Sequence, residues 1–368
     1  MIFKCYKDWE QLPDSAASLF DQCGKESMFF TREWFEALSA TALEEGQSLL
    51  LVAVVGEAGV GETSVRGVGG DESGVSETEA GKSRLLALLP LLESGNEHWK
   101  SCSHRYTALY SLLLAQDRQG DVLDCLADGL WQLPFRTLRL EPVADDDSNL
   151  QKLQAVLGSR GFECHQNFFF YNWYHLTRGQ SFEEYMAARP TQLRNTIARK
   201  RRKLERERDC SIRMYRGGEV EQALADYHAT YSSSWKAHEQ YGTLLDALAT
   251  NLAVPDWTRL AVLYIDGEPA AAQLWFVVQG KASIFRLAYD EAWKQYSPGS
   301  ILTAWLMQYV IDTDGVEEID FLTGNESYKQ DWMSGRRTRS RLVLGKKREG
   351  KSESGCLRSI VKRLFSRR

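Results

Sequence analysis

Apolar and polar positions divide the chain into two stretches of mixed helix and strand. In the first, apolar residues recur at helical spacing over 31–43, and the run LLLVAVV at 49–55 has the length and composition of a buried strand. Further strands are predicted at 84–92, 106–114 and 137–143, and further helices between 120 and 133 and between 148 and 160. The pattern therefore predicts a mixed unit of helices and strands in the first 150 residues.

The second stretch opens with the strand-like run FFFYNWYHL and continues with helical patterns over 181–209 and 217–239. An antiparallel meander follows over 259–290, because its Asp-Gly and Gln-Gly pairs are typical of hairpin turns. A helix entered through Ser-Pro-Gly, the strand EEIDFLTG and a last strand RSRLVLGKK come next. This order predicts an α+β unit built on one twisted sheet.

One segment of the first stretch does not fit either periodicity. Residues 56–82 are rich in Gly, Ser and Glu and contain no aromatic residue. Such a segment cannot offset the entropy of its own ordering by burying apolar surface. We therefore expect a disordered loop between two strands, and we attach no phosphate-binding role to its glycines.

Composition places the chain among ordinary globular proteins. It has 368 residues, 43% hydrophobic and 26% charged, which is long enough for two domains. With 45 basic and 50 acidic residues the net charge is -5, so any site for an anion has to be local. The seven cysteines form no CxxC pair, and no apolar run has the length of a membrane span. We expect reduced thiols and a cytoplasmic location.

The segment YSPGSILTA at 296–304 predicts a helix whose start can bind an anion. Pro298 suits the first turn, and Gly299 permits close approach of a ligand or a second backbone. The first amides of a helix lack internal partners and carry the positive end of the helix dipole. The alternative is structural, with Ser297 as a simple N-cap and Gly299 as a turn residue.

The segment IDFLTGNESYKQDW at 319–332 gathers chemical groups just beyond a predicted strand end. It places Glu326, Tyr328, Lys329 and Trp332 within seven residues. The alternative is again structural: Asp320 capping a turn, core aromatics, and a surface pair of Glu326 with Lys329. The functional interpretation is a site for acyl transfer, which needs a base for the acceptor, polarisation of the carbonyl and protonation of the leaving group.

These two segments together resemble one enzyme superfamily. FRLAYDEAWKQYSPGSILTAWLM followed by IDFLTGNESYKQDW is similar to the core of GCN5-related N-acetyltransferases (GNAT), and within them to the branch associated with CelD cellulose-biosynthesis proteins. That branch is akin to the FemAB aminoacyltransferases, which contain two GNAT-like units. The resemblance implies an α+β, GNAT-like fold of two tandem units, each a twisted mixed sheet flanked by helices. The expected boundaries are 1–165 for the first unit, 166–347 for the acyltransferase unit and 348–368 for a basic tail.

The resemblance also implies roles for residues of the second unit. The arm of acetyl-CoA, or of another acyl-CoA, would lie where the strand ending near Tyr289 separates from the strand ending near Leu322. The expected donor contacts are Leu287, Tyr289, Ser297, Gly299, Ser300 and Thr303. Tyr328 resembles the tyrosine that protonates the leaving sulfur, and Glu326 is the first candidate for the general base, with Asp320 the second. One feature departs from the family: the expected phosphate turn here contains a single glycine.

Residues for the acceptor are expected on several segments. We select Lys329, Trp332, Trp235, His238 and Arg199 as candidate acceptor contacts. Arg199 belongs to the segment 190–209, an amphipathic helix with a strongly basic outer face, which is either simply solvated or holds a phosphorylated acceptor or tRNA. No metal site is expected, because His98, Cys102 and His104 lack a fourth ligand at suitable spacing.

The sequence therefore predicts a GNAT-type N- or O-acyltransferase that moves an acyl group, acetyl first, from CoA to an amine or hydroxyl. The resemblance suggests a sugar precursor of cell-surface polysaccharide as the acceptor. Two alternatives remain: a FemAB-like aminoacyl transferase that uses charged tRNA, and a catalytically inactive scaffold subunit. The tail 355–368 has apolar residues on one helical face and basic residues around it, which suits an anionic membrane surface at the inner face of the membrane or packing on its own domain.

Overall fold

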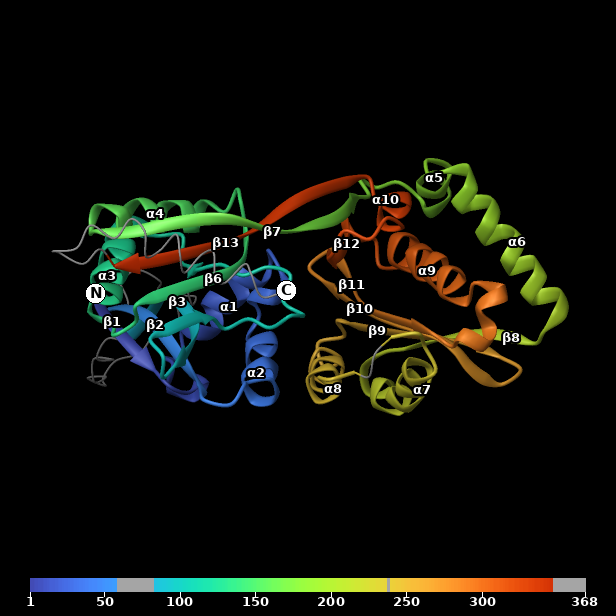
Figure 1. Ribbon diagram of the computed structural model, residues 1–368, viewed down its shortest axis with the longest axis horizontal. Helices are drawn as coiled ribbons and strands as arrows, with labels where there is room; N and C mark the ends of the chain where they lie inside the picture. Colours follow the sequence, from blue (N-terminus) through green and yellow to red (C-terminus); the bar gives the residue numbers. More distant parts are fainter. Residues whose placement is uncertain (58–82, 237–238, 347–368) are drawn as a thin grey trace, which may run out of the picture.

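The computed structural model describes residues 1–57, 83–236 and 239–346. His238, the tail 348–368 and nearly all of the loop expected at 56–82 therefore lie outside the described residues. In the described part, thirteen strands form one mixed sheet that runs through the molecule (Figure 1). The α+β prediction, with a mixed sheet flanked by helices, is confirmed. Within the same residues, no helix combines the length and the apolar character needed to cross a bilayer.

Two halves of the chain repeat one order of elements. The first half comprises β1 (Ile2–Tyr6), α1 (Ala16–Gly24), α2 (Arg32–Thr41), β2 (Gln47–Glu57), β3 (Ser83–Ser94), β4 (His98–Ser101), β5 (Leu113–Leu114), α3 (Gln119–Gln132), β6 (Thr137–Ala144), α4 (Ser148–Ser159) and β7 (Phe162–Leu176). After α5 (Phe182–Ala187) and α6 (Thr191–Glu207), the second half comprises β8 (Cys210–Tyr215), α7 (Val220–Ser232), α8 (Gly242–Asn251), β9 (Thr258–Ile265), β10 (Glu268–Val278), β11 (Lys281–Tyr289), α9 (Pro298–Gln308), β12 (Glu318–Thr323), α10 (Lys329–Trp332) and β13 (Gly335–Lys346). Apart from the short β5, the elements β1 to β7 correspond one to one with β8 to β13.

The last strand of each half completes the sheet of the other half. The strand order is β1-β2-β3-β4-β6-β13-β7-β12-β11-β10-β9-β8, with β5 beside β3. β7 pairs antiparallel with β12, and β13 pairs antiparallel with β6. β7 and β13 also pair with each other from Gly335↔Tyr174 to Lys346↔Phe162. Figure 1 shows these two long strands side by side across the middle of the molecule. The exchange joins the two halves through backbone hydrogen bonds.

The strand predicted at 106–114 is largely wrong. Only Leu113–Leu114 pair with β3, and the preceding residues leave the sheet as a loop. The apolar side chains of this loop are nevertheless buried, because Tyr110 lies in the core and donates its hydroxyl to the Pro90 carbonyl at 2.6 Å. Burial without strand pairing produces the same apolar run as a buried strand, so periodicity could not separate the two.

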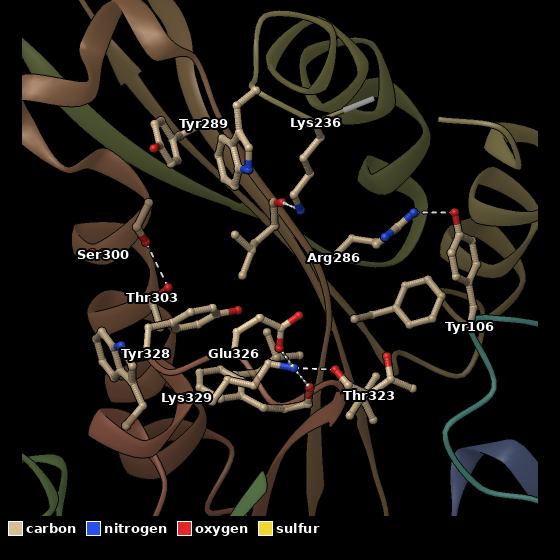
Figure 2. A pocket seen from close by; sticks show the side chains of 18 of the residues that line it. Tyr106, Lys236, Arg286, Tyr289, Ser300, Thr303, Thr323, Glu326, Tyr328 and Lys329 are labelled. Atoms are coloured by element: carbon tan, nitrogen blue, oxygen red, sulfur yellow. Dashed lines mark hydrogen bonds and ion pairs between the residues drawn. The ribbon is translucent and has the colours of Figure 1, made fainter. Parts of the chain in front are cut away.

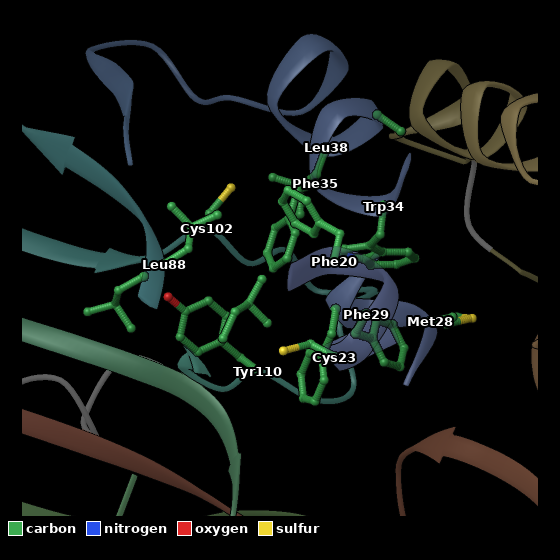
Figure 3. Close-up of a cluster of buried hydrophobic side chains, with 14 of the residues drawn as sticks. Phe20, Cys23, Met28, Phe29, Trp34, Phe35, Leu38, Leu88, Cys102 and Tyr110 are labelled. Atoms are coloured by element: carbon green, nitrogen blue, oxygen red, sulfur yellow. The ribbon is translucent and has the colours of Figure 1, made fainter. Parts of the chain in front are cut away.

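The hydrophobic core continues from the first half into the second. Trp34 of α2 is fully buried, and its ring meets Phe29 edge-on at 4.6 Å between centroids (Figure 3). The same indole lies 6.1 Å from the ring of Phe285 on β11. α7 and α8 cover the same face of β9–β11 as this contact, whereas α9 and α6 cover the opposite face (Figure 1). Packing as well as strand exchange therefore fixes β11 against the first half.

We predict that Trp34→Ala lowers the free energy of unfolding by about 3–5 kcal/mol, because it leaves a large cavity among side chains fixed by both halves. Trp131→Ala is the matched control: its indole is 40% exposed, so the loss should be about 1–2 kcal/mol. Urea denaturation followed by circular dichroism measures both values. Equal losses in the two variants would contradict the assignment of Trp34 as a contact that joins the halves.

Candidate active site

The candidate site lies where β11 and β12 separate. The two strands pair in parallel from Lys281↔Glu318 to Ser283↔Asp320, and their register stops there although β11 continues to Tyr289 and β12 to Thr323. The far ends of the strands therefore leave a gap between them. The expectation that the strands ending near Tyr289 and Leu322 separate agrees with this register.

A bend in β12 accounts for the separation. Leu322 has φ +54°, which a β-strand does not accommodate, and the pairing of β12 with β7 shifts register between Asp320 and Thr323. Asp320 stabilises the bend, because its Oδ1 accepts the backbone N–H of Leu322 at 2.6 Å. Its Oδ2 accepts a hydrogen bond from Nη2 of Arg337 at 2.6 Å. Asn172, which lies on β7, donates a hydrogen bond to Oδ1.

Lys329 stabilises the other side of the bend. Its Nζ donates to the carbonyl of Phe321 at 3.2 Å and to the carbonyl of Thr323, and it pairs with Glu326 Oε2 at 3.0 Å. Backbone carbonyls that no longer face a neighbouring strand need another donor when they are buried. The buried ammonium supplies it, and burial in turn lowers the pKa of Lys329.

The gap opens into a cavity of about 660 Å³ (Figure 2). Its lining residues come from both halves of the chain: Arg105, Tyr106, Trp235, Lys236, Ile284, Phe285, Arg286, Leu287, Tyr289, Gly299, Ser300, Thr303, Phe321, Leu322, Thr323, Glu326, Tyr328, Lys329 and Trp332. The start of α9 lies at one end of this set, and the loop after β4 lies at the other (Figure 2). The cavity therefore has the size of a small-molecule site and passes between the ends of two strands.

The start of α9 is held open toward the cavity. Ser297 is the N-cap, with φ +55°, and its side chain makes no capping hydrogen bond. A Cβ on Gly299 would lie 3.1 Å from Cδ1 of Tyr289, so glycine is what allows the helix to pack against the end of β11. Behind the helix, buried Gln273 donates Nε2 to the Gly299 carbonyl at 2.9 Å and to Thr303 Oγ1 at 2.8 Å. A rigid helix start without a side-chain cap, at the positive end of the helix dipole, fits an anionic group.

Glu326 and Tyr328 lie on the β12 side of the cavity. Both belong to the turn after β12, and the Glu326 carboxylate is exposed, apart from its pair with Lys329. The Tyr328 ring meets Phe321 edge-on at 6.0 Å, and partial burial together with the Glu326 carboxylate raises its pKa to about 12. At neutral pH the phenol therefore stays protonated and can donate a hydrogen bond.

The opposite end of the cavity carries a polar network that the sequence did not indicate. Arg286 of β11 pairs with Glu239, and the hydroxyl of Tyr106 donates to the same carboxylate. The Arg286 guanidinium also lies over the Tyr106 ring, 4.2 Å from its centroid. Arg105, the neighbour of Tyr106, is exposed at the mouth. Burial raises the pKa of Tyr106, and the hydrogen bond that its hydroxyl donates to Glu239 raises the pKa further.

Most residues selected from the sequence line this cavity. Among the expected donor contacts these are Leu287, Tyr289, Gly299, Ser300 and Thr303, and among the other candidates Glu326, Tyr328, Lys329, Trp332 and Trp235. Ser297 occupies the N-cap position of α9 without capping it and lies outside the lining set, and Arg199 lies exposed on α6, also outside it. Trp235 is half exposed and packs on Tyr289 at 4.5 Å between centroids.

Two expected roles need correction. Asp320 is buried outside the cavity, and both of its oxygens accept hydrogen bonds within the bend, so it does not fit a general base. Lys329 lines the cavity, but its ammonium group already donates hydrogen bonds to two backbone carbonyls and pairs with Glu326. It therefore does not fit the role of an acceptor contact. The sequence placed both residues correctly at the strand end and could not indicate which partners they face.

The corresponding strands of the first half, β4 and β6, also stop pairing after a few residues, but hydrogen bonds of the protein bridge the gap between them. β4 and β6 also pair in parallel over three residues, from His98↔Thr137 to Lys100↔Arg139. Beyond them, the Ser101 hydroxyl donates to the Glu141 carbonyl at 2.8 Å, and the Tyr110 N–H donates to the Pro142 carbonyl at 2.6 Å. The gap between the two parallel strands is therefore bridged by hydrogen bonds in the first half and open in the second half.

The described residues contain no group of three or more His, Cys, Asp or Glu side chains that could hold a metal ion.

We predict that Asp320→Ala lowers the free energy of unfolding by about 3 kcal/mol, because it leaves the buried Leu322 amide without its acceptor and removes one of the two carboxylates that pair with Arg337. Glu317→Ala removes an exposed carboxylate from the residue before β12 and should change that free energy by less than about 0.5 kcal/mol. Urea denaturation gives both values. Wild-type stability of Asp320→Ala would show that the bend does not depend on this carboxylate.

Comparison with known proteins supports the same architecture. Residues 191–330 match the family model described as an acetyltransferase (GNAT) domain. A search of curated proteins finds no match. Among solved structures, FemX has a TM-score of 0.61 at 10% identity, covering 92% of this chain and 96% of that one.

Two further solved structures are similar. A conserved protein of unknown function from Bacteroides thetaiotaomicron has a TM-score of 0.50 at 12% identity, covering 71% of this chain and 83% of that one. A tandem GNAT protein from the clavulanic acid biosynthesis pathway has a TM-score of 0.42 at 11% identity, covering 95% and 100%. At these identities the likeness concerns the fold alone. The chain has a GNAT-like fold, and the half that carries the open cavity contains the region that matches the GNAT acetyltransferase domain.

Proposed function

We propose that the second half transfers an acyl group from a CoA thioester to an amine or hydroxyl acceptor. One observation carries the proposal: β11 and β12 separate beside an uncapped helix start, and the resulting cavity contains Glu326 and Tyr328. An extended thioester arm needs an unpaired strand edge, and its phosphates need an anion site at one end of that edge. Both features occur together in this cavity.

The donor would be held by backbone groups more than by side chains. The start of α9 would bind the pyrophosphate through the Gly299 amide, the Ser300 hydroxyl and the positive end of the helix dipole, since the Ser300 amide already donates to the Ser297 carbonyl at 3.1 Å. The arm would follow the free edge of β11 past Tyr289 and Leu287. A backbone amide of that edge would donate to the thioester oxygen, on which negative charge develops during attack.

Glu326 and Tyr328 would serve the proton steps. Glu326 would accept the acceptor's proton, directly or through a water molecule. Tyr328 would donate a hydrogen bond to the leaving thiolate. Complete proton transfer from a phenol with a pKa of about 12 to a thiolate, whose acid has a pKa of about 8.5, is uphill. The thiolate would therefore take its proton from the solvent.

The end of the cavity opposite α9 favours an acceptor that carries negative charge. Arg105 and Arg286 face this end, and Glu239 offsets only one of the two cations. A phosphate or carboxylate on the acceptor would be attracted there. A phosphorylated or nucleotide-linked sugar precursor of cell-surface polysaccharide would meet this requirement, and the resemblance of the sequence to CelD-associated proteins supports that choice.

A second candidate is aminoacyl transfer from charged tRNA. The fold likeness to FemX extends over 92% of the chain, and α6 presents an exposed basic face that includes Arg199. Binding of tRNA that weakens steeply with salt would favour this candidate over an acyl-CoA donor. An inactive scaffold would neither hydrolyse acetyl-CoA nor transfer an acyl or aminoacyl group.

We predict that Tyr328→Phe and Glu326→Gln each lower kcat about 100-fold, the usual contribution of a hydrogen bond to a developing anion and of a positioned base, respectively. Release of free CoA thiol from acetyl-CoA, in the presence of a panel of amine and sugar acceptors, measures turnover. Tyr171→Phe and Glu317→Gln, both outside the cavity, are the matched controls and should keep wild-type turnover.

A thermal shift with acetyl-CoA shows whether the variants still fold and bind. A ligand at a hundred times its Kd adds about 2.7 kcal/mol of stability, so the shift should be the same in wild type and variants. Wild-type turnover in both variants would remove the proposed roles. The absence of any shift with acetyl-CoA, longer acyl-CoAs and CoA would exclude the proposed donor.

A further inference from the structure

Lys236 is a cavity residue to which the proposed reaction gives no role. It follows α7, and its side chain extends into the cavity toward β11 (Figure 2). Its Nζ donates to the carbonyl of Leu287, on the strand that β12 leaves unpaired. The amine therefore lies against the edge along which the donor arm would run.

This amine differs in its partners from two other cations of the cavity. Arg286 pairs with Glu239, and Lys329 pairs with Glu326. Within the described residues, no carboxylate lies within ion-pair distance of Lys236; its ammonium instead approaches the faces of Tyr231 and Trp235, 5.7 Å and 5.5 Å from their centroids.

Burial, and next the nearby Arg286 cation, lowers the pKa of Lys236 to about 8. At pH 8 about half of the molecules then carry a neutral amine, whereas an ordinary lysine is almost wholly protonated. Only the neutral amine is a nucleophile.

We propose that Lys236 is an acyl acceptor within the cavity, so that the chain acylates its own side chain when donor is bound. The inference rests on the proposed function, because it needs a thioester in the gap between β11 and β12. Nζ attacks the thioester carbonyl carbon, a C–N bond forms and the C–S bond breaks. The proton lost by nitrogen passes through Glu326 or solvent to the thiolate, and the products are Nε-acyl-Lys236 and free CoA.

The modification would limit further turnover. An amide carries no charge, so the burial cost of the ammonium disappears and the product is favoured. The acyl group on Lys236 would also occupy the space beside Leu287 that the next donor arm requires. Acylation therefore closes the cavity from within, and activity should fall in proportion to the fraction modified.

The test uses the purified full chain with acetyl-CoA and no acceptor, followed by peptide mass spectrometry. We expect Lys236 to be acetylated at least ten times faster than Lys294, an exposed lysine on the same half. The rate should rise between pH 7 and pH 8 and level off above it, and excess CoA should suppress acetylation of Lys236 but not of Lys294. Lys236→Arg should remove the modification.

Two results would overturn the inference and leave the proposed function intact. One is an unmodified Lys236 in a chain whose melting temperature acetyl-CoA still raises. The other is acetylation of Lys236 that excess CoA does not suppress, or that proceeds equally fast in the urea-unfolded chain, because either marks a purely chemical reaction. If acetyl-CoA causes neither acetylation nor a thermal shift, the proposed donor fails together with the inference.

Discussion

The site depends on how the chain keeps two parallel strands apart. Unpaired backbone groups at a strand end are costly when buried, so strands that begin to pair tend to continue. Here a bend at Leu322 turns β12 away from β11, and two charged side chains satisfy the groups that the bend exposes. Asp320 accepts the Leu322 amide, and Lys329 donates to the carbonyls on either side of it. Specific side-chain hydrogen bonds therefore stabilise the gap, which does not result from fraying of the sheet.

The repeat shows which half of the chain contains the open cavity. Both halves contain a short parallel pairing of two strands, yet Ser101 and Tyr110 bridge the gap beyond it in the first half. That half contributes to the open site in another way, because the loop after β4 brings Arg105 and Tyr106 to the far end of the cavity. Strand exchange and the contact of Trp34 with Phe285 fix this loop relative to β11. The first half thus supports and shapes a cavity that the second half forms.

Much of the fold and of the site could be predicted from local patterns. The Ser-Pro-Gly entry of α9 and the polar cluster after β12 are short motifs, and each lies within one turn of its element. The groups from distant segments could not be found in this way. Nothing near Arg105 or Tyr106 indicates a cavity formed by residues about 130 to 230 positions later, and the roles of Asp320 and Lys329 depend on partners that only tertiary pairing supplies. Arg286 did leave a signal, as a single charge inside the apolar strand SIFRLAY.

The central claim is that the separation of β11 and β12 exists to take an extended thioester arm. A crystal structure of the chain with CoA tests it most directly. The account predicts the arm between β11 and β12, displacing Lys236 from the Leu287 carbonyl, with the pyrophosphate at the start of α9. CoA bound elsewhere, or β11 and β12 hydrogen-bonded to their ends in the complex, would contradict it.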